Sequence, residues 1–279
     1  MSTERAEAND GPDAGDLRRE WERWREKRAA AVAAPYGPLS VTGTRWIAEA
    51  EDGAIAGLPG RWAESADGES VLLEAGVADG LAVDDELLAG EVRLGEDDEG
   101  DPGASRVSYG PRRLVLMRRE GQWVVRVFDP EAPSRRAFQG IDAFPYDPAW
   151  VRPGAFRAYE EGERSVLVGN ADGRERGLGL AGHLIFTEPG GGEHRLQVAV
   201  VAGGGLWAVL ADGTSGRTSY PFRFLRTGAP RAGNAVTVDF NRTTLPPCAF
   251  TDNFLCPFPP PGNRLPFDVP AGERNVSGT

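Results

Sequence analysis

Short runs of alternating apolar and polar residues, separated by turn-forming residues, fill most of this chain from residue 37 onward. Two of the clearest runs, Arg112–Arg118 and Gln122–Phe128, flank Arg119-Glu120-Gly121, which predicts a tight hairpin. The 279 residues include 37 glycines and 22 prolines, an excess that favours turns and short strands over long helices. The sequence therefore predicts a mainly β fold of antiparallel strands, arranged as a sandwich or a barrel-like structure.

One segment near the N-terminus has a helical period instead. Its apolar or partly apolar positions recur at spacings of three and four residues: Leu17, Trp21, Trp24, Arg28 (through its aliphatic stem) and Ala31. Asp13 or Asp16 can cap the start of this helix, and Pro35 ends it. We expect a single amphipathic helix that docks onto a sheet.

The chain divides into three segments on composition. Residues 1–12 are polar and are expected to form a disordered tail. The proline-rich stretch Phe138–Pro153 is incompatible with a long helix or a central strand, so we interpret it as a packed linker with a boundary near Trp150. This predicts two packed β subdomains, 13–150 with the N-terminal helix and 151–279.

The charge balance bears on the partners of the protein. The formal net charge is −11, and 40% of the residues are hydrophobic. An acidic surface repels phosphates, which argues against nucleic acid and against anionic membrane surfaces. The sequence has no apolar run of roughly eighteen residues and no apolar signal-peptide core at its start. We therefore expect a soluble, cytoplasmic protein with a sizeable core, whose favoured partner is a small molecule.

A block of distinctive motifs occupies the C-terminal part of the chain. In order they are Asp212-Gly213-Thr214-Ser215-Gly216, Arg223, Asp239-Phe240-Asn241, Pro246-Pro247-Cys248-Ala249, Cys256-Pro257-Phe258-Pro259-Pro260, Asn263-Arg264-Leu265 and Ala271-Gly272-Glu273. This succession resembles the bacterial and archaeal family labelled domain of unknown function 1684. The resemblance extends over most of the chain, from about Asp16 to Glu273. It implies no activity, because none is established for the family.

The sequence departs from the family pattern at one place. After the tyrosine that follows the first motif, which is Tyr220 here, the family usually has Gly-Arg, whereas this chain has Pro221-Phe222-Arg223.

Prolines make the C-terminal block a stiff scaffold for polar groups, because each one fixes a φ angle. Strand alternation places Asp239 and Asn241 on the same side of the strand that they end. The candidate ligand-binding residues of the block are Asp212, Arg223, Asn241, Asn263 and Arg264. The alternative is that these groups cap turns and fasten an irregular loop to the sheet, as Asp and Asn commonly do.

The two cysteines, Cys248 and Cys256, allow four interpretations. They can be buried reduced side chains, or a disulfide across a short loop, although a cytosolic location disfavours that bond. Cys248 can be a reactive thiol if a cation or base lowers its pKa. The pair are also weak candidates for metal ligands, joined by His183 and His194, although the spacing is not that of common zinc sites.

Two hypotheses of function remain. The first is that the C-terminal block binds a small molecule without catalysis. The alternative is an enzyme, a hydrolase or a thiol-dependent one, that uses Asp239, Cys248 and Glu273. The sequence contains no Gly-x-Ser-x-Gly elbow, no phosphate-binding loop with lysine and no His-Glu-x-x-His, so it assigns neither a reaction nor a cofactor.

Overall fold

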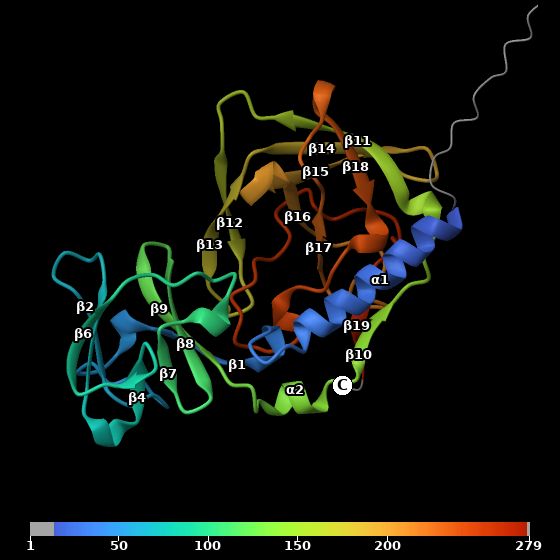
Figure 1. Cartoon of the computed structure of the whole chain (residues 1–279). Coiled ribbons are helices and arrows are strands. Elements are labelled where there is room, and N and C mark those ends of the chain that lie inside the picture. The colour runs from blue at the N-terminus through green and yellow to red at the C-terminus, as the bar shows by residue number, and fades with distance from the viewer. Residues whose placement is uncertain (1–13, 278–279) are drawn as a thin grey trace, which may run out of the picture.

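The computed structural model describes residues 14–277 and confirms a mainly β protein with one N-terminal helix. Every pair of named strands within these residues is antiparallel. The predicted tail, 1–12, and the capping candidate Asp13 lie outside the described residues. Figure 1 shows two strand-rich halves side by side, with the helix α1 (Ala14–Val32) lying along the C-terminal half.

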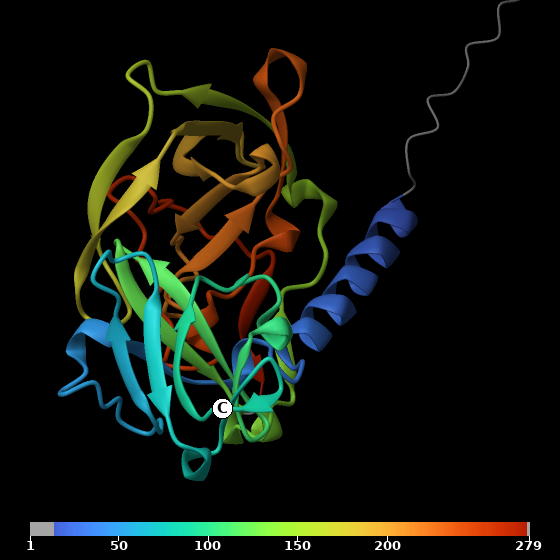
Figure 2. The ribbon, with the colours of Figure 1, turned by 60° about the vertical axis from the view of Figure 1, so that its left-hand side comes forward.

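Helix α1 docks on the C-terminal half through its predicted face. The Trp21 side chain is only 5% exposed, and its indole Nε1 donates a hydrogen bond of 2.8 Å to the backbone oxygen of Asn241. One turn further on, Arg25 donates to the backbone oxygen of Ile141. Figure 2 shows α1 on the outside of the molecule, so one face meets protein and the other faces solvent.

Two sheets form the N-terminal half. A six-stranded sheet has the order β1 (Val41–Trp46), β9 (Gln122–Phe128), β8 (Arg112–Arg119), β7 (Val107–Tyr109), β4 (Leu81–Val83) and β5 (Glu86–Leu87). A three-stranded sheet has the order β2 (Arg61–Glu64), β3 (Val71–Ala75) and β6 (Gly90–Leu94). The two sheets share one buried apolar cluster, in which Trp62 and Leu73 meet Leu116 and Trp123, so this half is a sandwich.

The predicted hairpin joins β8 and β9. Arg119 pairs with Gln122, which leaves Glu120 and Gly121 as the two turn residues. Both have positive φ angles, 54° and 76°, as the tight turn that suits twisted antiparallel strands requires.

The C-terminal half is built on a second six-stranded sheet. Its order is β17 (Arg223–Arg226), β16 (Leu206–Leu210), β15 (Glu193–Val200), β14 (Gly182–Thr187), β11 (Val151–Ala158) and β18 (Ala235–Asp239). Two ribbons complete it: β12 (Arg164–Gly169) with β13 (Glu175–Leu180), and β10 (Gly140–Ala143) with β19 (Glu273–Ser277).

The remaining helices are short. They are α2 (Pro133–Ala137) and the 3₁₀ turns η1 (Pro38–Ser40), η2 (Ile47–Glu49), η3 (Val77–Asp79), η4 (Pro102–Ala104), η5 (Pro148–Trp150), η6 (Ala202–Gly204), η7 (Ala232–Asn234), η8 (Phe240–Arg242) and η9 (Pro247–Ala249). None of the helices between residues 14 and 277 is both long and apolar enough to cross a membrane.

The interpretation of Phe138–Pro153 as a linker is wrong in part. The stretch contains β10 and the first residues of β11, which lies between β14 and β18. Pro153 pairs with Thr237 of β18, whereas pairing with β14 begins one residue later, at Gly154. The proline therefore stands at the end of the β14 ladder, where a missing N–H is tolerated.

The segment that follows β18, residues 240–277, covers both halves, and we call it the tail. Its residues Leu265 and Val269 pack into the apolar core of the C-terminal sheet. Phe254 and Leu255 pack instead against the outer face of the N-terminal six-stranded sheet, beside Val124 and Phe128. That sheet is consequently covered on both faces, and the tail joins the two halves.

Candidate functional site

The C-terminal motif block surrounds a cavity of about 570 Å³. One wall comes from the turn between β16 and β17, which contributes Asp212, Ser215 and Tyr220. The facing wall comes from the tail, whose polar contributions are Cys248 and Arg264. Two segments that are distant in sequence therefore enclose one space.

Aromatic side chains form the apolar part of this cavity. Tyr220, Phe222 and Phe258 all line it. The ring of Phe222 makes edge-to-face contacts with both of the others, with centroid separations of 5.7 Å to Tyr220 and 5.3 Å to Phe258. Phe258, which lines the cavity, is 39% exposed.

Two unpaired charges stand at the edge of the same cavity. Asp252 and Arg264 line it, and both residues are exposed. Neither side chain forms a hydrogen bond or an ion pair with any residue from 14 to 277. A guanidinium with five free donors and a carboxylate with free acceptors are thus available to a ligand.

The two cysteines are free, buried and adjacent. The backbone N–H of Cys248 donates to Sγ of Cys256 at 3.3 Å, and the Tyr220 hydroxyl lies 3.8 Å from Sγ of Cys248. A hydrogen bond from the Cys256 thiol lowers the pKa of Cys248. The same bond, together with burial, raises the pKa of Cys256. Cys248, which lines the cavity, is therefore the thiol that ionises first.

Asp212 and Arg223, two of the predicted ligand-binding residues, form a buried ion pair. Their side chains are fully enclosed, and Nη2 of Arg223 lies 2.7 Å from Oδ2 of Asp212. Arg223 also donates to three backbone oxygens of the tail, those of Val269, Ala271 and Glu273. The pair fastens the tail to the sheet, so Arg223 has little left to offer a ligand.

Asn241 and Asn263 use their amides to bind the backbone. The Asn263 side chain accepts from the N–H of Gln197 and donates to the oxygens of Gln197 and Val209. The Asn241 side chain accepts from the N–H of Asp147 and donates to the Asp147 oxygen and to the Asp239 carboxylate. Both residues are almost completely buried and hold loops to strands.

Asp239 and Glu273, the predicted partners of Cys248 in catalysis, lie away from the cavity. Asp239 accepts hydrogen bonds from Asn241 and lies 3.3 Å from Nε of Arg242. Glu273 accepts from Nε of Arg28 at 3.2 Å and from the N–H of Leu245 at 2.7 Å.

Burial raises the pKa of both Asp239 and Glu273. Neither lines the cavity that contains Cys248, so the three do not meet at one site.

Metal binding finds no support within residues 14–277. No group of three or more His, Cys, Asp or Glu side chains in this range could hold a metal ion. His183 lies on β14 and His194 on β15, and neither lines the cavity with the cysteines.

Sequence reasoning missed the aromatic part of the cavity. Tyr220, Phe222 and Phe258 belong to the motif block, and each of them is next to a proline. The sequence signal that could have revealed them is the alternation of aromatic residues with prolines, because prolines hold the aromatic rings on a stiff backbone. Asp252 lies on the same proline-stiffened loop as the two cysteines, but it was not among the candidate site residues.

The fold and the cavity define a mainly β protein in which a proline-rich tail closes one side of a ligand-sized space. The chain belongs to the family described as "Protein of unknown function (DUF1684)", whose model matches residues 136–274. This match confirms the resemblance drawn from the motifs, and the matched range contains every residue that lines the cavity.

The chain is also similar to an uncharacterized protein from gene locus rrnAC0354 of Haloarcula marismortui, known from a solution NMR structure. The two are 31% identical, the match covers 51% of this chain and 80% of the other, and the TM-score is 0.42. No curated protein matches the chain.

Proposed function

We propose that this protein binds a small organic molecule that has an aromatic or apolar body and one anionic group, in the cavity of the C-terminal block. The observation that carries the proposal is the free guanidinium of Arg264 at the edge of an aromatic-lined space. The volume, about 570 Å³, falls in the range of roughly 300–1,000 Å³ that ligand sites occupy.

The aromatic residues account for the apolar body of the ligand. Burying the exposed ring of Phe258 against a ligand removes apolar surface from water, which is favourable by about 25 cal/mol per Å². The edges of Tyr220 and Phe222 offer further ring contacts.

The two free charges account for its polar groups. Arg264 matches a carboxylate, because the planar guanidinium donates two parallel hydrogen bonds. Asp252 takes a hydrogen-bond donor, such as an amine or hydroxyl, and repels a second anionic group. The ligand that fits therefore carries one anion and one donor.

A binding experiment with matched probes tests this function. Benzoates with amino or hydroxyl groups are compared with their neutral amides by isothermal titration calorimetry. Losing a hydrogen bond to a charged group weakens binding by about 1.5–3 kcal/mol, so Arg264→Gln should weaken carboxylate binding tenfold or more and leave the amides unchanged. Phe258→Ala should weaken both.

Arg231→Gln is the control, because that exposed arginine has no side-chain partner within residues 14–277 and lies outside the cavity. Carboxylates that bind Arg264→Gln as tightly as the wild type, or a wild type that binds none of the probes, would overturn the proposal.

A thiol-dependent reaction is the second candidate, favoured by the position and the lowered pKa of Cys248. Asp239 and Glu273 do not line this cavity, so a reaction here relies on Cys248 and Tyr220. A chloroacetamide attached to a benzoate should alkylate Cys248 in the wild type, with loss of chloride. Slower labelling in Arg264→Gln would show that the cavity guides it, whereas equal labelling would argue against a site-directed thiol.

A further inference from the structure

A second cavity, of about 540 Å³, lies where the two halves of the molecule and the tail meet. Its charged lining consists of Arg119, Arg126, Arg176, Arg226, Glu99 and Glu120, and we call it the arginine cleft. Four cations against two anions make this lining positive, in a chain whose formal net charge is −11. The local field therefore opposes that of the whole protein and attracts anions.

Arg126 is the central residue of the cleft. It projects from β9 toward the tail, where its guanidinium lies 4.9 Å from the ring centre of Phe254, and it is only 8% exposed. Nε donates a long hydrogen bond of 3.3 Å to the Thr44 hydroxyl. The Nη1 and Nη2 atoms have no hydrogen-bond acceptor within residues 14–277.

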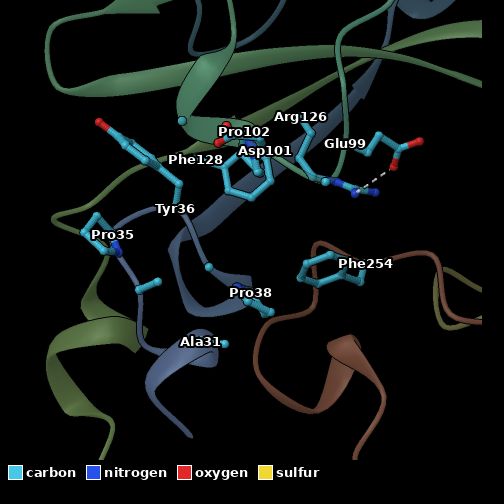
Figure 3. A pocket seen from close by; sticks show the side chains of 14 residues that line it. Ala31, Pro35, Tyr36, Pro38, Glu99, Asp101, Pro102, Arg126, Phe128 and Phe254 are labelled. Atoms are coloured by element: carbon cyan, nitrogen blue, oxygen red, sulfur yellow. Dashed lines mark ion pairs between the residues drawn. The ribbon is translucent and has the colours of Figure 1, made fainter. Parts of the chain in front are cut away.

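The nearest carboxylate does not satisfy Arg126. Glu99 lies 3.9 Å from Nη1, an ion-pair contact that is beyond hydrogen-bond distance. The dashed line in Figure 3 marks this ion pair. Glu99 instead accepts two hydrogen bonds from Arg119. Burial and the nearby Arg119 lower the pKa of Arg126 to about 10, so the guanidinium is still charged at neutral pH.

The other arginines of the cleft divide into paired and free. Arg176 is held by Asp172 at 2.6 Å and by Glu120 at 2.9 Å. Arg226 forms no hydrogen bond or ion pair through its side chain with the described part of the chain. Arg226, which has no side-chain partner among the described residues, and Arg126, whose one ion pair is the long contact with Glu99, thus border one cavity.

A buried charge whose one ion pair is too long for a hydrogen bond, as that of Arg126 is, is costly unless something adds counter-charge. The cleft also holds an uncharged donor that is unused, because the indole Nε1 of Trp207 is buried without an acceptor among the described residues. An anion in the cleft would supply the hydrogen-bond acceptors that these cations and this N–H donor lack.

We propose that the arginine cleft binds the phosphate group of a small phosphate monoester. Such a phosphate carries nearly two negative charges at neutral pH and three acceptor oxygens, which matches two separate guanidiniums. A carboxylate carries one charge, so it balances the charge of only one of them.

The space on the other side of Arg126 is where the organic part of the ester extends. A neighbouring cavity of about 550 Å³ shares Glu99, Arg126 and Phe254 with the cleft. Figure 3 shows that its other walls are mainly apolar, with the rings of Tyr36, Phe128 and Phe254 around it. The ligand class is therefore an organic phosphate with an apolar body.

Calorimetry on the full chain tests the proposal, with phenyl phosphate, inorganic phosphate, phenol and benzoate as probes. Phenyl phosphate should bind tightest, inorganic phosphate more weakly, and phenol not at all. Arg226→Gln, an exposed position, should weaken phenyl phosphate about tenfold, and Arg126→Gln about a hundredfold. Arg231→Gln is the matched control and should leave binding unchanged. Raising the salt concentration should weaken the binding of phenyl phosphate to the wild type.

Several results would overturn the proposal. They are a wild type that does not bind phenyl phosphate, equal binding by Arg226→Gln and Arg231→Gln, and benzoate that binds the Arg264→Gln variant as tightly as phenyl phosphate does. Inorganic phosphate that binds more tightly than the ester would show a site for the free ion and would exclude the ester. Because Arg126→Gln can perturb folding, Arg226→Gln is the deciding variant. Arg264→Gln should leave phosphate binding intact, which separates this site from the first cavity.

Discussion

Replacing Arg223 by methionine should remove a large share of the stability of this protein. The side chain is fully buried and makes four hydrogen bonds, of which one goes to Asp212 and three go to tail oxygens. Breaking a buried ion pair from one side costs about 3–5 kcal/mol, because the remaining charge is uncompensated. Each buried carbonyl that loses its hydrogen bond adds about 1 kcal/mol to the loss of stability. Water that enters the site offsets part of this amount.

Arg223→Met should therefore lower the free energy of unfolding by at least about 4 kcal/mol. The free energy of unfolding of a native protein is typically about 5–15 kcal/mol. At roughly 2–4 °C per kcal/mol for a protein of this size, the melting temperature should fall by about 8 °C or more. Urea unfolding followed by tryptophan fluorescence measures the free energy, and calorimetry measures the melting temperature.

A double-mutant cycle isolates the ion pair. In an Asp212→Asn background no buried carboxylate is left behind, so Arg223→Met should cost about 2 kcal/mol less than in the wild type. Arg231→Met is the surface control and should change stability by no more than about 0.5 kcal/mol. A loss below about 1 kcal/mol for Arg223→Met, or strict additivity in the cycle, would refute the assignment of this pair as the anchor of the tail.

Three further predictions concern the docked helix, a buried acid and the thiols. Trp21→Ala should lower the free energy of unfolding by about 3–5 kcal/mol. Trp24→Ala, a change at a partly exposed position on the same helix, should lower it by less than half of that. Equal losses in urea unfolding would contradict the docking of α1 through Trp21. The pKa of Glu273 is raised in the folded state above its ordinary value of 4.5, so the folded state holds this proton more tightly than the unfolded chain. The wild type should accordingly lose stability relative to Glu273→Gln as pH rises from about 4.5 through the folded pKa, and melting curves at pH 4 and 7 that keep a constant difference would exclude this. Iodoacetamide should modify Cys248 before Cys256, because the pKa of Cys248 is lowered and that of Cys256 raised; peptide mapping by mass spectrometry that finds the reverse order would contradict the assignment.

Much of the strand pattern could be predicted because it rests on local chemistry. The strand Gln122–Phe128 was predicted with the bounds that the structure shows. The hairpin at Glu120-Gly121 follows from the glycine and from the apolar runs on both sides of it. In these places the sequence of a few residues already determines the backbone.

Other features depend on contacts between distant segments and could not be predicted. Along β9 nearly every residue is buried, including Arg126, because one face meets the second sheet and the other meets the tail. An arginine in an alternating strand normally indicates a solvated face, so the arginine cleft has no local signal. Pro153 was misjudged for a related reason, since its tolerance depends on where the neighbouring strand begins.

The candidate site divides in the same way. Cys248 and Arg264 were predicted as polar residues of one block, and the structure places both on the wall of one cavity. Asn241, Asn263 and the ion pair of Asp212 with Arg223 belong to the same motifs, but they hold the tail in place. Sequence cannot separate these two roles, because both favour Asp, Asn and Arg beside prolines.

The contact between Arg28 and Glu273 joins the first helix of the described chain to its last strand. During synthesis, α1 leaves the ribosome long before its partners, because Asn241 follows Trp21 by 220 residues and Glu273 follows Arg28 by 245. The nascent helix must therefore keep its tryptophan-bearing face exposed until the tail arrives, and closing so long a loop makes this a late and slow step of folding. Chaperones that shield such a face should matter more for this protein than for one whose first helix packs on its neighbours in sequence.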